Sequence, residues 1–438
     1  MNLLKQIFIY GGTASLIFLL SCEEETVTVK EEVIVTDTVT VTDTVTVVDT
    51  DTVTVVDTDT VLVGFAVPEK YVFLRETNST VSFGGQTTRL KMAVHFIAAM
   101  SDNTLTLDKL VGMWAHEEGG EDFPDDTTLN SSGKQIKNKT GANTGSEVNS
   151  AAIKADIETW VTSQVNDVFP NWANDASSGV AGNIQQAGGG STRYVNANGL
   201  ELNQAVNKAL IGAFVADQAI NGYLTPGKLD GGTNMDDQTA GTTLEGKYYT
   251  NMEHYWDEGF GYVYGMAEDA TDPVTTPGSD DKFLLKYIKK VEEDSDFAGT
   301  APAIFNNFKL GRAALVGGDF VTRDAAAKDV AGAVSKTIAV RAAHYLKAGA
   351  VGKAEATPDY ASIFHNLSEG YGFVYSLQFT RNPATAEPYF TREQVTEMLA
   401  KVYPTSGDKK GFWDVTGAEL TEVATEIATA FGFTYDEA

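Results

Sequence analysis

Residues 254–265, HYWDEGFGYVYG, and residues 365–376, HNLSEGYGFVYS, are two copies of one motif. Six of the twelve positions are identical, and two more exchange Phe for Tyr. Both copies place His and Glu four residues apart and then continue with Gly-aromatic-Gly. On an α-helix, residues separated by four, seven, eight and eleven positions share one face. The repeat therefore predicts two equivalent helices, each with a polar face notched by glycine.

The shared face of each copy carries candidate functional residues. Motif 1 (residues 254–265) presents His254, Glu258 and Tyr262 on this face, and motif 2 (residues 365–376) presents His365 and Glu369. Glycine inside a helix costs about 0.5–1 kcal/mol relative to Ala. Its recurrence at matched positions therefore indicates the close approach of another backbone. We expect the two polar faces to meet inside the protein, near a pseudo-twofold axis.

Each motif helix has its own predicted start. Thr250 and Glu253 have the spacing of a capping box, in which each side chain bonds the backbone N–H of the other residue. Before motif 2, Thr357 is the expected cap, with Pro358 at the first helical position and Asp359 in the first turn. Helices are therefore expected over both motifs despite their glycines.

The remainder of the body predicts further helices. Apolar residues recur with helical period near residues 87–98, 150–165, 199–224, 302–316, 324–348, 391–403 and 416–433. No run of alternating residues is long enough to build a sheet. We expect residues 65–438 to form one all-α body, a large helical bundle of about ten helices. Its two pseudo-repeated halves are expected at about 190–270 and 300–380.

The first 64 residues predict a membrane anchor followed by a stalk. Lys5 precedes an apolar run that ends at Cys22, the single cysteine of the chain. This pattern predicts a lipoprotein signal peptide over residues 1–21, with acylation of Cys22. Residues 22–64 are rich in Thr, Val and Asp, which is typical of an extended, disordered segment. We expect an outer-membrane lipoprotein of the cell envelope, held to the membrane through its lipid.

The charge of the chain excludes one class of partner. Its 438 residues include 32 basic and 60 acidic side chains, which give a formal net charge of -28. Such a chain repels nucleic acid, so we predict no DNA- or RNA-binding role. No Gly-x-Ser-x-Gly elbow is present and the cysteine is assigned to the anchor. We therefore assign no catalytic residue and predict no enzyme activity.

Five stretches together resemble a family of Bacteroidota lipoproteins described only as domain of unknown function 4856. They are STVSFGGQTTRLKM (79–92), STRYVNANGLELNQAVNKALIGA (191–213), MEHYWDEGFGYVYG (252–265), FKLGRAAL (308–315) and IFHNLSEGYGFVYSL (363–377). The resemblance implies a location in the cell envelope and no particular activity. The acidic triplet Glu23–Glu25 also resembles the signal that exports such lipoproteins to the outer face of the outer membrane.

A more distant similarity points to the imelysin-like proteins, helical envelope lipoproteins linked to iron acquisition. Their marker is Gly-x-His-x-x-Glu, whereas both motifs of this chain have His-x-x-x-Glu. No site residue is transferred from that family. The similarity implies only that a role in uptake, related to iron, is compatible with the sequence.

Three hypotheses for the motif faces stay open at this stage. In the first, His254, Glu258, His365 and Glu369 form a His2Glu2 centre suited to a divalent transition metal, Fe or Zn. In the second, the same side chains only stabilise the bundle through a buried polar network. The supporting residues of that network would be Glu253, Asp257, Lys208, Arg341 and Tyr262. In the third, aromatic residues and acidic loops form a groove for a small ligand or an envelope protein partner.

Overall fold

The computed structural model describes residues 65–438, except residues 275, 277, 279 and 280. The predicted signal peptide, the acylated Cys22 and the stalk lie outside the described residues. Within them the protein is all-α, as predicted, with fourteen α-helices and two antiparallel two-stranded hairpins. Five of these helices fall in segments for which no helix was predicted: α2 (Leu107–Trp114), α3 (Thr127–Asn130), α6 (Pro226–Leu229), α7 (Asn234–Ala240) and α9 (Leu284–Glu292).

The predicted helices are all present, with shifted ends. They are α1 (Gly84–Ala99), α4 (Glu147–Ser163), α5 (Leu202–Leu210), α8 (Asn251–Tyr264), α10 (Thr300–Val316), α11 (Phe320–Ala354), α12 (Tyr360–Ser376), α13 (Arg392–Val402) and α14 (Gly417–Phe431). Motif 1 lies on α8 and motif 2 lies on α12. The α5 helix continues through two π-helical segments, η5 (Ile211–Ala216) and η6 (Ala219–Tyr223).

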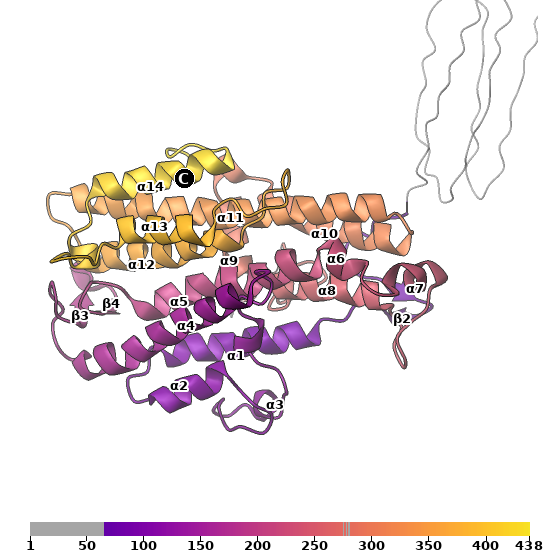
Figure 1. Ribbon diagram of the computed structural model, residues 1–438, viewed down its shortest axis with the longest axis horizontal. Helices are drawn as coiled ribbons and strands as arrows, with labels where there is room; N and C mark the ends of the chain where they lie inside the picture. Colours follow the sequence, from indigo (N-terminus) through magenta and orange to yellow (C-terminus); the bar gives the residue numbers. More distant parts are fainter. Residues whose placement is uncertain (1–64, 275, 277, 279–280) are drawn as a thin grey trace, which may run out of the picture.

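The longest helix, α11, organises the second half of the chain. It packs against α10, α12 and α14, and α12 packs in turn against α5. In Figure 1, α14 lies at one edge of the bundle and α1 and α2 lie at the opposite edge, with α5 between these layers. The first half places α8 against α1, α10 and η6. Motif 1 and motif 2 are thus built into different parts of the bundle.

The continuous helix from α5 to η6 forms the centre of the core. Every residue from 205 to 220 is buried. Nearly all apolar members of this run, among them Val206, Leu210 and Phe214, are fully inaccessible. Burial on all sides requires that polar residues of the same run find partners inside the protein, because an unpaired buried polar group costs free energy. Lys208 and Asp217 are the charged residues to which this applies.

The two hairpins are short and peripheral. One joins β1 (Leu74–Arg75) to β2 (Asn78–Ser79), and the other joins β3 (Gly182–Gln185) to β4 (Thr192–Val195) in the register Gly182↔Val195. Runs of two to four residues leave too little alternating pattern to be recognised in the sequence. The first hairpin matters for the site described below, because Arg75 reaches α8 from it.

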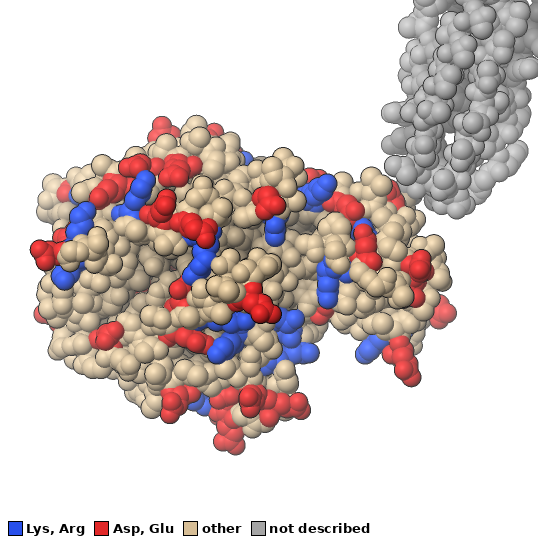
Figure 2. All heavy atoms as spheres, viewed as in Figure 1, with Lys and Arg blue, Asp and Glu red and all other residues tan. Residues whose placement is uncertain are grey.

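Acidic side chains are spread over the face of the body that Figure 2 shows, with basic ones among them.

None of the helices in the described residues combines the length and the apolar character needed to cross a bilayer.

Candidate functional site

The predicted helix start is confirmed for α8 and is wrong for α12. Thr250 and Glu253 form the predicted capping box at α8, with both reciprocal bonds present. At α12 the prediction of Thr357 as cap and Pro358 as first helical residue is wrong. The cap is Asp359, whose carboxylate accepts hydrogen bonds from the backbone N–H groups of Ala361 at 3.2 Å and Ser362 at 3.4 Å. A carboxylate satisfies two N–H groups here and complements the helix dipole.

The four motif residues lie in two separate pairs. On α8, Nε2 of His254 is 3.8 Å from Oε1 of Glu258, and on α12 the same atoms of His365 and Glu369 are also 3.8 Å apart. No group of three or more His, Cys, Asp or Glu side chains in the described part of the chain is placed to hold a metal ion. The structure therefore does not bring the two pairs together into one His2Glu2 centre. We call the surroundings of the α8 pair site 1 and those of the α12 pair site 2.

Site 1 is built by α1, α8 and η6. Nδ1 of His254 donates to the backbone carbonyl of Ser82 at 3.0 Å, and Nε2 faces Glu258. Nε2 of Gln86 donates to Oε1 of Glu258 at 2.8 Å. The Tyr223 hydroxyl also bonds this carboxylate, and burial followed by the charge of Glu258 raises the pKa of Tyr223.

Site 2 repeats this plan with a charged partner. Nδ1 of His365 donates to Oε2 of Glu201 at 2.6 Å, so Nε2 again faces the glutamate of its own helix. Lys208 of α5 lies with its Nζ 3.0 Å from Oε1 of Glu369. Burial opposes ionisation of Glu369, but Lys208 and a bond from Tyr345 outweigh it and hold the pKa of Glu369 at about 2. Site 2 is therefore a satisfied, charge-paired version of site 1.

Glycine contacts show that the two sites are equivalent in their packing as well. A Cβ added to Gly259 would meet Tyr223 and Leu224, and one added to the matched Gly370 would meet Tyr345 and Leu346. A Cβ on Gly261 would meet Gln86, and one on the matched Gly372 would meet Lys208. Close neighbours are thus present at all four glycines, but the predicted approach of another backbone to within 3 Å of the added Cβ occurs among them only at Gly372, where the Ala205 carbonyl oxygen would lie 2.6 Å away. The partners are other helices, α1 and η6 for motif 1 and α5 and α11 for motif 2.

One helix takes part in both sites. Its first part, α5, supplies Lys208 to site 2, and its last part, η6, supplies Tyr223 to site 1. Between them, Oγ of Ser376 accepts from the Gly212 backbone N–H at 3.0 Å and donates to the Lys208 carbonyl at 2.7 Å. This hydroxyl stands between a donor and an acceptor that are four residues apart, and such an insertion accounts for the π-helical turn that starts at Ile211.

Two predicted supporting residues, Glu253 and Asp257, belong to a third cluster on another face of α8. The fully buried Arg312 places Nε 3.0 Å from Oδ1 of Asp257 and Nη1 3.4 Å from Oε1 of Glu253. Tyr71 donates to the same Asp257 oxygen at 2.7 Å, and Arg75 reaches Glu253 at 3.1 Å. This cluster ties α8 to α10 and to the start of the body, so its role is structural.

The other predicted supporting residues do lie at the sites. Lys208 is a direct partner in site 2, and the Arg341 guanidinium lies 4.5 Å from the centre of the Tyr345 ring in the same site. Tyr262 packs beside Tyr223 in site 1, with ring centres 6.0 Å apart. Sequence reasoning missed Gln86, Tyr223 and Tyr345 as site residues. Their sequence separation from the motifs leaves no local signal, apart from the glycines that indicated some close neighbour.

The pairs offer limited ligands to a metal ion. Each site supplies one imidazole nitrogen and one carboxylate, whereas bound Zn commonly has at least three protein ligands. Oε1 of the carboxylate is already engaged, by Gln86 in site 1 and by Lys208 in site 2. In favour of a cation, each Nδ1–H bonds a protein oxygen, which is the arrangement that orients a metal-binding histidine.

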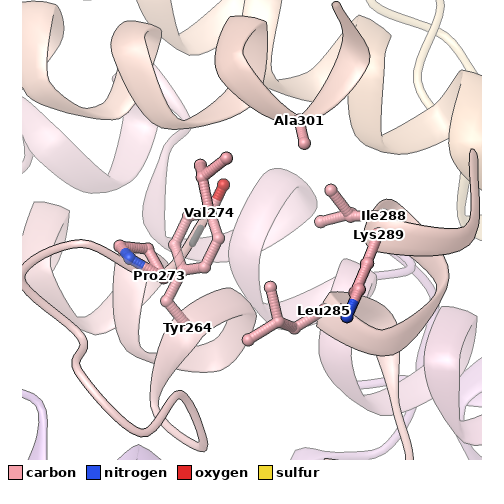
Figure 3. A pocket seen from close by; sticks show the side chains of 7 residues that line it. All are labelled: Tyr264, Pro273, Val274, Leu285, Ile288, Lys289 and Ala301. Atoms are coloured by element: carbon pink, nitrogen blue, oxygen red, sulfur yellow. The ribbon is translucent and has the colours of Figure 1, made fainter. Parts of the chain in front are cut away.

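Two hollows in the described residues are lined by residues outside sites 1 and 2. A small apolar cavity of about 10 Å³ lies between α8, α9 and α10, lined by Tyr264, Pro273, Val274, Leu285, Ile288, Lys289 and Ala301 (Figure 3). This volume is near the lower limit for one water molecule, and a water also needs polar partners. A shallow surface depression lies along α4 and η2 (Gln164–Val168), away from both motifs. Ligand binding at the sites thus involves their solvent-facing edges, where His254 and His365 are half-buried.

Comparison with known proteins agrees with the family resemblance and not with the more distant one. No significant match was found among curated proteins or among solved structures. The similarity to imelysin-like proteins is not confirmed. A known family matches residues 68–434, nearly the whole body, and it includes both motifs and all the side chains of sites 1 and 2. The chain therefore belongs to the family described as domain of unknown function 4856.

Proposed function

We propose that this protein is an envelope lipoprotein, anchored through Cys22, that binds a ligand at sites 1 and 2 as a component of uptake. The anchor rests on the signal-peptide pattern that ends at Cys22 and on the low-complexity segment that follows it. An anchored, stalked body would hold its binding sites outside the membrane. We propose that a body held in this position binds its ligand outside the membrane so that the cell can take the ligand up.

The matched geometry of the two His–Glu pairs carries the binding proposal. In both sites Nδ1 is occupied by a protein acceptor, and Nε2 faces a carboxylate oxygen 3.8 Å away. When the imidazole is neutral, its Nε2 lone pair and the carboxylate oxygen are together complementary to one group between them that carries positive charge or donates hydrogen bonds. A divalent transition metal, Fe or Zn, and an organic amine share this chemistry.

A structural role is the second candidate, and site 2 favours it. Glu369 is held by Lys208 and Tyr345, so its carboxylate is satisfied without any ligand. A charge-paired buried network of this kind positions helices relative to one another. Under this alternative, the motifs would set the packing of α12 on α5 and α11, and the surface of the body would bind envelope partners.

The test uses the full-length protein purified without chelator. Elemental analysis detects bound metal and native mass spectrometry detects a bound organic molecule, in the parent and in a His254→Ala/His365→Ala variant. We expect the parent to carry a ligand that the variant lacks. The control is His95→Ala, on α1 beside Phe123 and outside both motifs, which should keep the ligand. Equal ligand content in parent and double variant, or no ligand in either, would contradict the proposal.

A further inference from the structure

A group of basic side chains that have no ion-pair partner among the described residues lies beside site 1. It consists of Arg89 on α1, Lys134, Lys139 on η1 (Lys137–Lys139) and Lys228 on α6, and we call it the basic cluster. In Figure 2, basic side chains gather on the visible face over the region where α1 lies in Figure 1, whereas acidic side chains predominate over the region of α3. Such a concentration is unexpected in a chain whose net charge is -28.

The four side chains converge on Tyr223 and Gly85. The Lys139 and Lys228 ammonium groups lie 6.0 Å and 5.8 Å from the centre of the Tyr223 ring. A Cβ added to Gly85 would lie 3.2 Å from Cε of Lys134 and 3.5 Å from Nη1 of Arg89. Three separate segments of the chain therefore bring positive charge to one place, although like charges repel.

The guanidinium of Arg89 lacks the partners that burial requires. Arg89 is 8% exposed, and its buried Nε has no hydrogen-bond partner in the described residues. Its Nη1 donates only to the carbonyl of Gly85, one turn back on its own helix, at 3.4 Å. Buried donors are nearly always satisfied, and an exception indicates an ordered water, a bound ion or ligand, or a strained site.

The pKa of Lys139 is lowered, in part because of the other positive charges of the cluster. Burial lowers its pKa, and repulsion from Arg89 lowers it further, with smaller contributions from Lys228 and Lys134. The charge of Glu258 opposes these effects. One carboxylate can offset only one of the four positive charges of the cluster. By contrast, the adjacent Lys137 is neutralised by Glu158 at 2.6 Å.

We propose that the basic cluster binds an oxyanion with two or more negative charges. Guanidinium and ammonium groups together bind phosphate and carboxylate oxygens through charge-assisted hydrogen bonds. An oxyanion that reaches Arg89 would supply the missing acceptor and remove the repulsion among the four cations. The rings of Tyr223 and Tyr255, the latter 3.9 Å from the Lys228 ammonium, form an aromatic wall for the same site.

This site adjoins site 1 and does not depend on the binding proposed there. The cation-seeking edge of site 1 is formed by His254 and Glu258, whereas the basic cluster uses four other side chains. Positive charge near Glu258 disfavours a cation at that edge, and a bound oxyanion would relieve this cost. The two bindings are therefore expected to strengthen each other, but each can be measured alone.

The experiment is calorimetric titration of the full-length protein with inorganic phosphate and, separately, with citrate, at low ionic strength. Phosphate represents phosphoryl ligands and citrate represents polycarboxylates, and the tighter of the two identifies the source of the oxyanion. We expect Arg89→Gln and Lys139→Met each to weaken binding at least tenfold. The control Lys137→Met should bind as the parent does, because its lysine is already paired.

Folding is checked by circular dichroism and by the melting temperature of each variant. Should Arg89→Gln fail to fold, Lys139→Met combined with Lys228→Met tests the same site, because these two side chains are less buried. His254→Ala separates this proposal from the proposed function, since oxyanion binding is expected to remain in that variant. Absence of binding by both anions, or equal binding by the parent and the folded cluster variants, would overturn the proposal.

Discussion

Gly372 of α12 lies against Lys208 of α5 so closely that a Cβ on the glycine would be 2.5 Å from Cβ of the lysine. The same added atom would lie 2.6 Å from the Ala205 carbonyl oxygen, which belongs to the backbone and cannot turn aside. This contact is what allows the Lys208 side chain to reach Glu369. The recurrence of Gly in the motif thus has a direct physical cause.

We expect Gly372→Ala to destabilise the protein by about 1–3 kcal/mol, the usual cost of overpacking a core. The matched control is Gly370→Ala, where the nearest atoms are side-chain carbons of Tyr345 and Leu346 at 3.2 Å and 3.4 Å. Those atoms can shift, and Ala gains helix propensity, so the cost should be clearly smaller. Urea unfolding measures both, and equal losses would show that close backbone approach is not the reason for Gly372.

Arg312 is the residue whose removal should cost most among the charged groups. It is fully buried, and its loss leaves Asp257 and Glu253 without their shared cation. Breaking a buried ion pair from one side costs about 3–5 kcal/mol, so we expect that loss for Arg312→Met in denaturant unfolding. Arg75→Met is the comparison, because Arg75 is 32% exposed and shares only Glu253. A similar loss in both variants would contradict this ranking.

Glu369 predicts an acid-sensitive contribution to stability. Its pKa is about 2 in the folded protein, against 4.5 for the unperturbed group. A carboxyl with a lowered folded-state pKa stabilises above its unfolded pKa, and this contribution is lost as pH falls from about 4.5 to 2. We expect about 3 kcal/mol, from 1.36 kcal/mol per unit.

The measurement is the pH dependence of the unfolding free energy in the parent and in Glu369→Gln. The parent should lose more stability than the variant over this range, because only the parent has the titrating carboxyl. Lys208→Met should shift the loss to higher pH, since the first cation that lowers the Glu369 pKa is removed. Parallel curves for the parent and Glu369→Gln would be incompatible with the role assigned to Lys208.

Two residues, Thr357 and Asp359, are candidates for the N-cap of α12, and substitution of each one distinguishes between them. Asp359→Ala removes the carboxylate that bonds two backbone N–H groups, and we expect a loss of about 1 kcal/mol, as for other N-caps. Thr357→Ala should leave the stability nearly unchanged, because Thr357 precedes the helix. Thermal unfolding of the two variants decides the matter, and a larger effect of Thr357→Ala would restore the cap predicted from the sequence.

Features that depend on residues close in the sequence were predictable, whereas contacts between distant segments were not. Thr250 and Glu253 were assigned correctly because a capping box depends on residues three positions apart. Thr357 was wrong because two cap signals overlap around Pro358, and the three-dimensional contacts of the segment select the second. Gln86 lies 172 residues from Glu258, and no periodicity connects them. Glycine at matched positions predicted that some backbone approaches the motif, but it could not identify which helix.

The expectation that both motif faces meet had a similar limit. Equivalent residues in a repeat predict equivalent environments, and this holds for the two His–Glu pairs. Repetition alone does not place the two environments next to each other. Each His–Glu pair has its hydrogen-bond and ion-pair partners on helices outside the repeat, such as α1. The repeat therefore gave no reason to expect the two faces to contact each other.

The helix from α5 to η6 has a consequence for how the body can be divided. It belongs to the first half by sequence, yet it completes the surroundings of the second motif through Lys208. A fragment that starts after residue 223 would keep motif 2 and lose the helix against which α12 packs. We therefore expect residues 65–438 to unfold as one cooperative unit, so that neither motif keeps its native surroundings when its half of the chain is expressed alone.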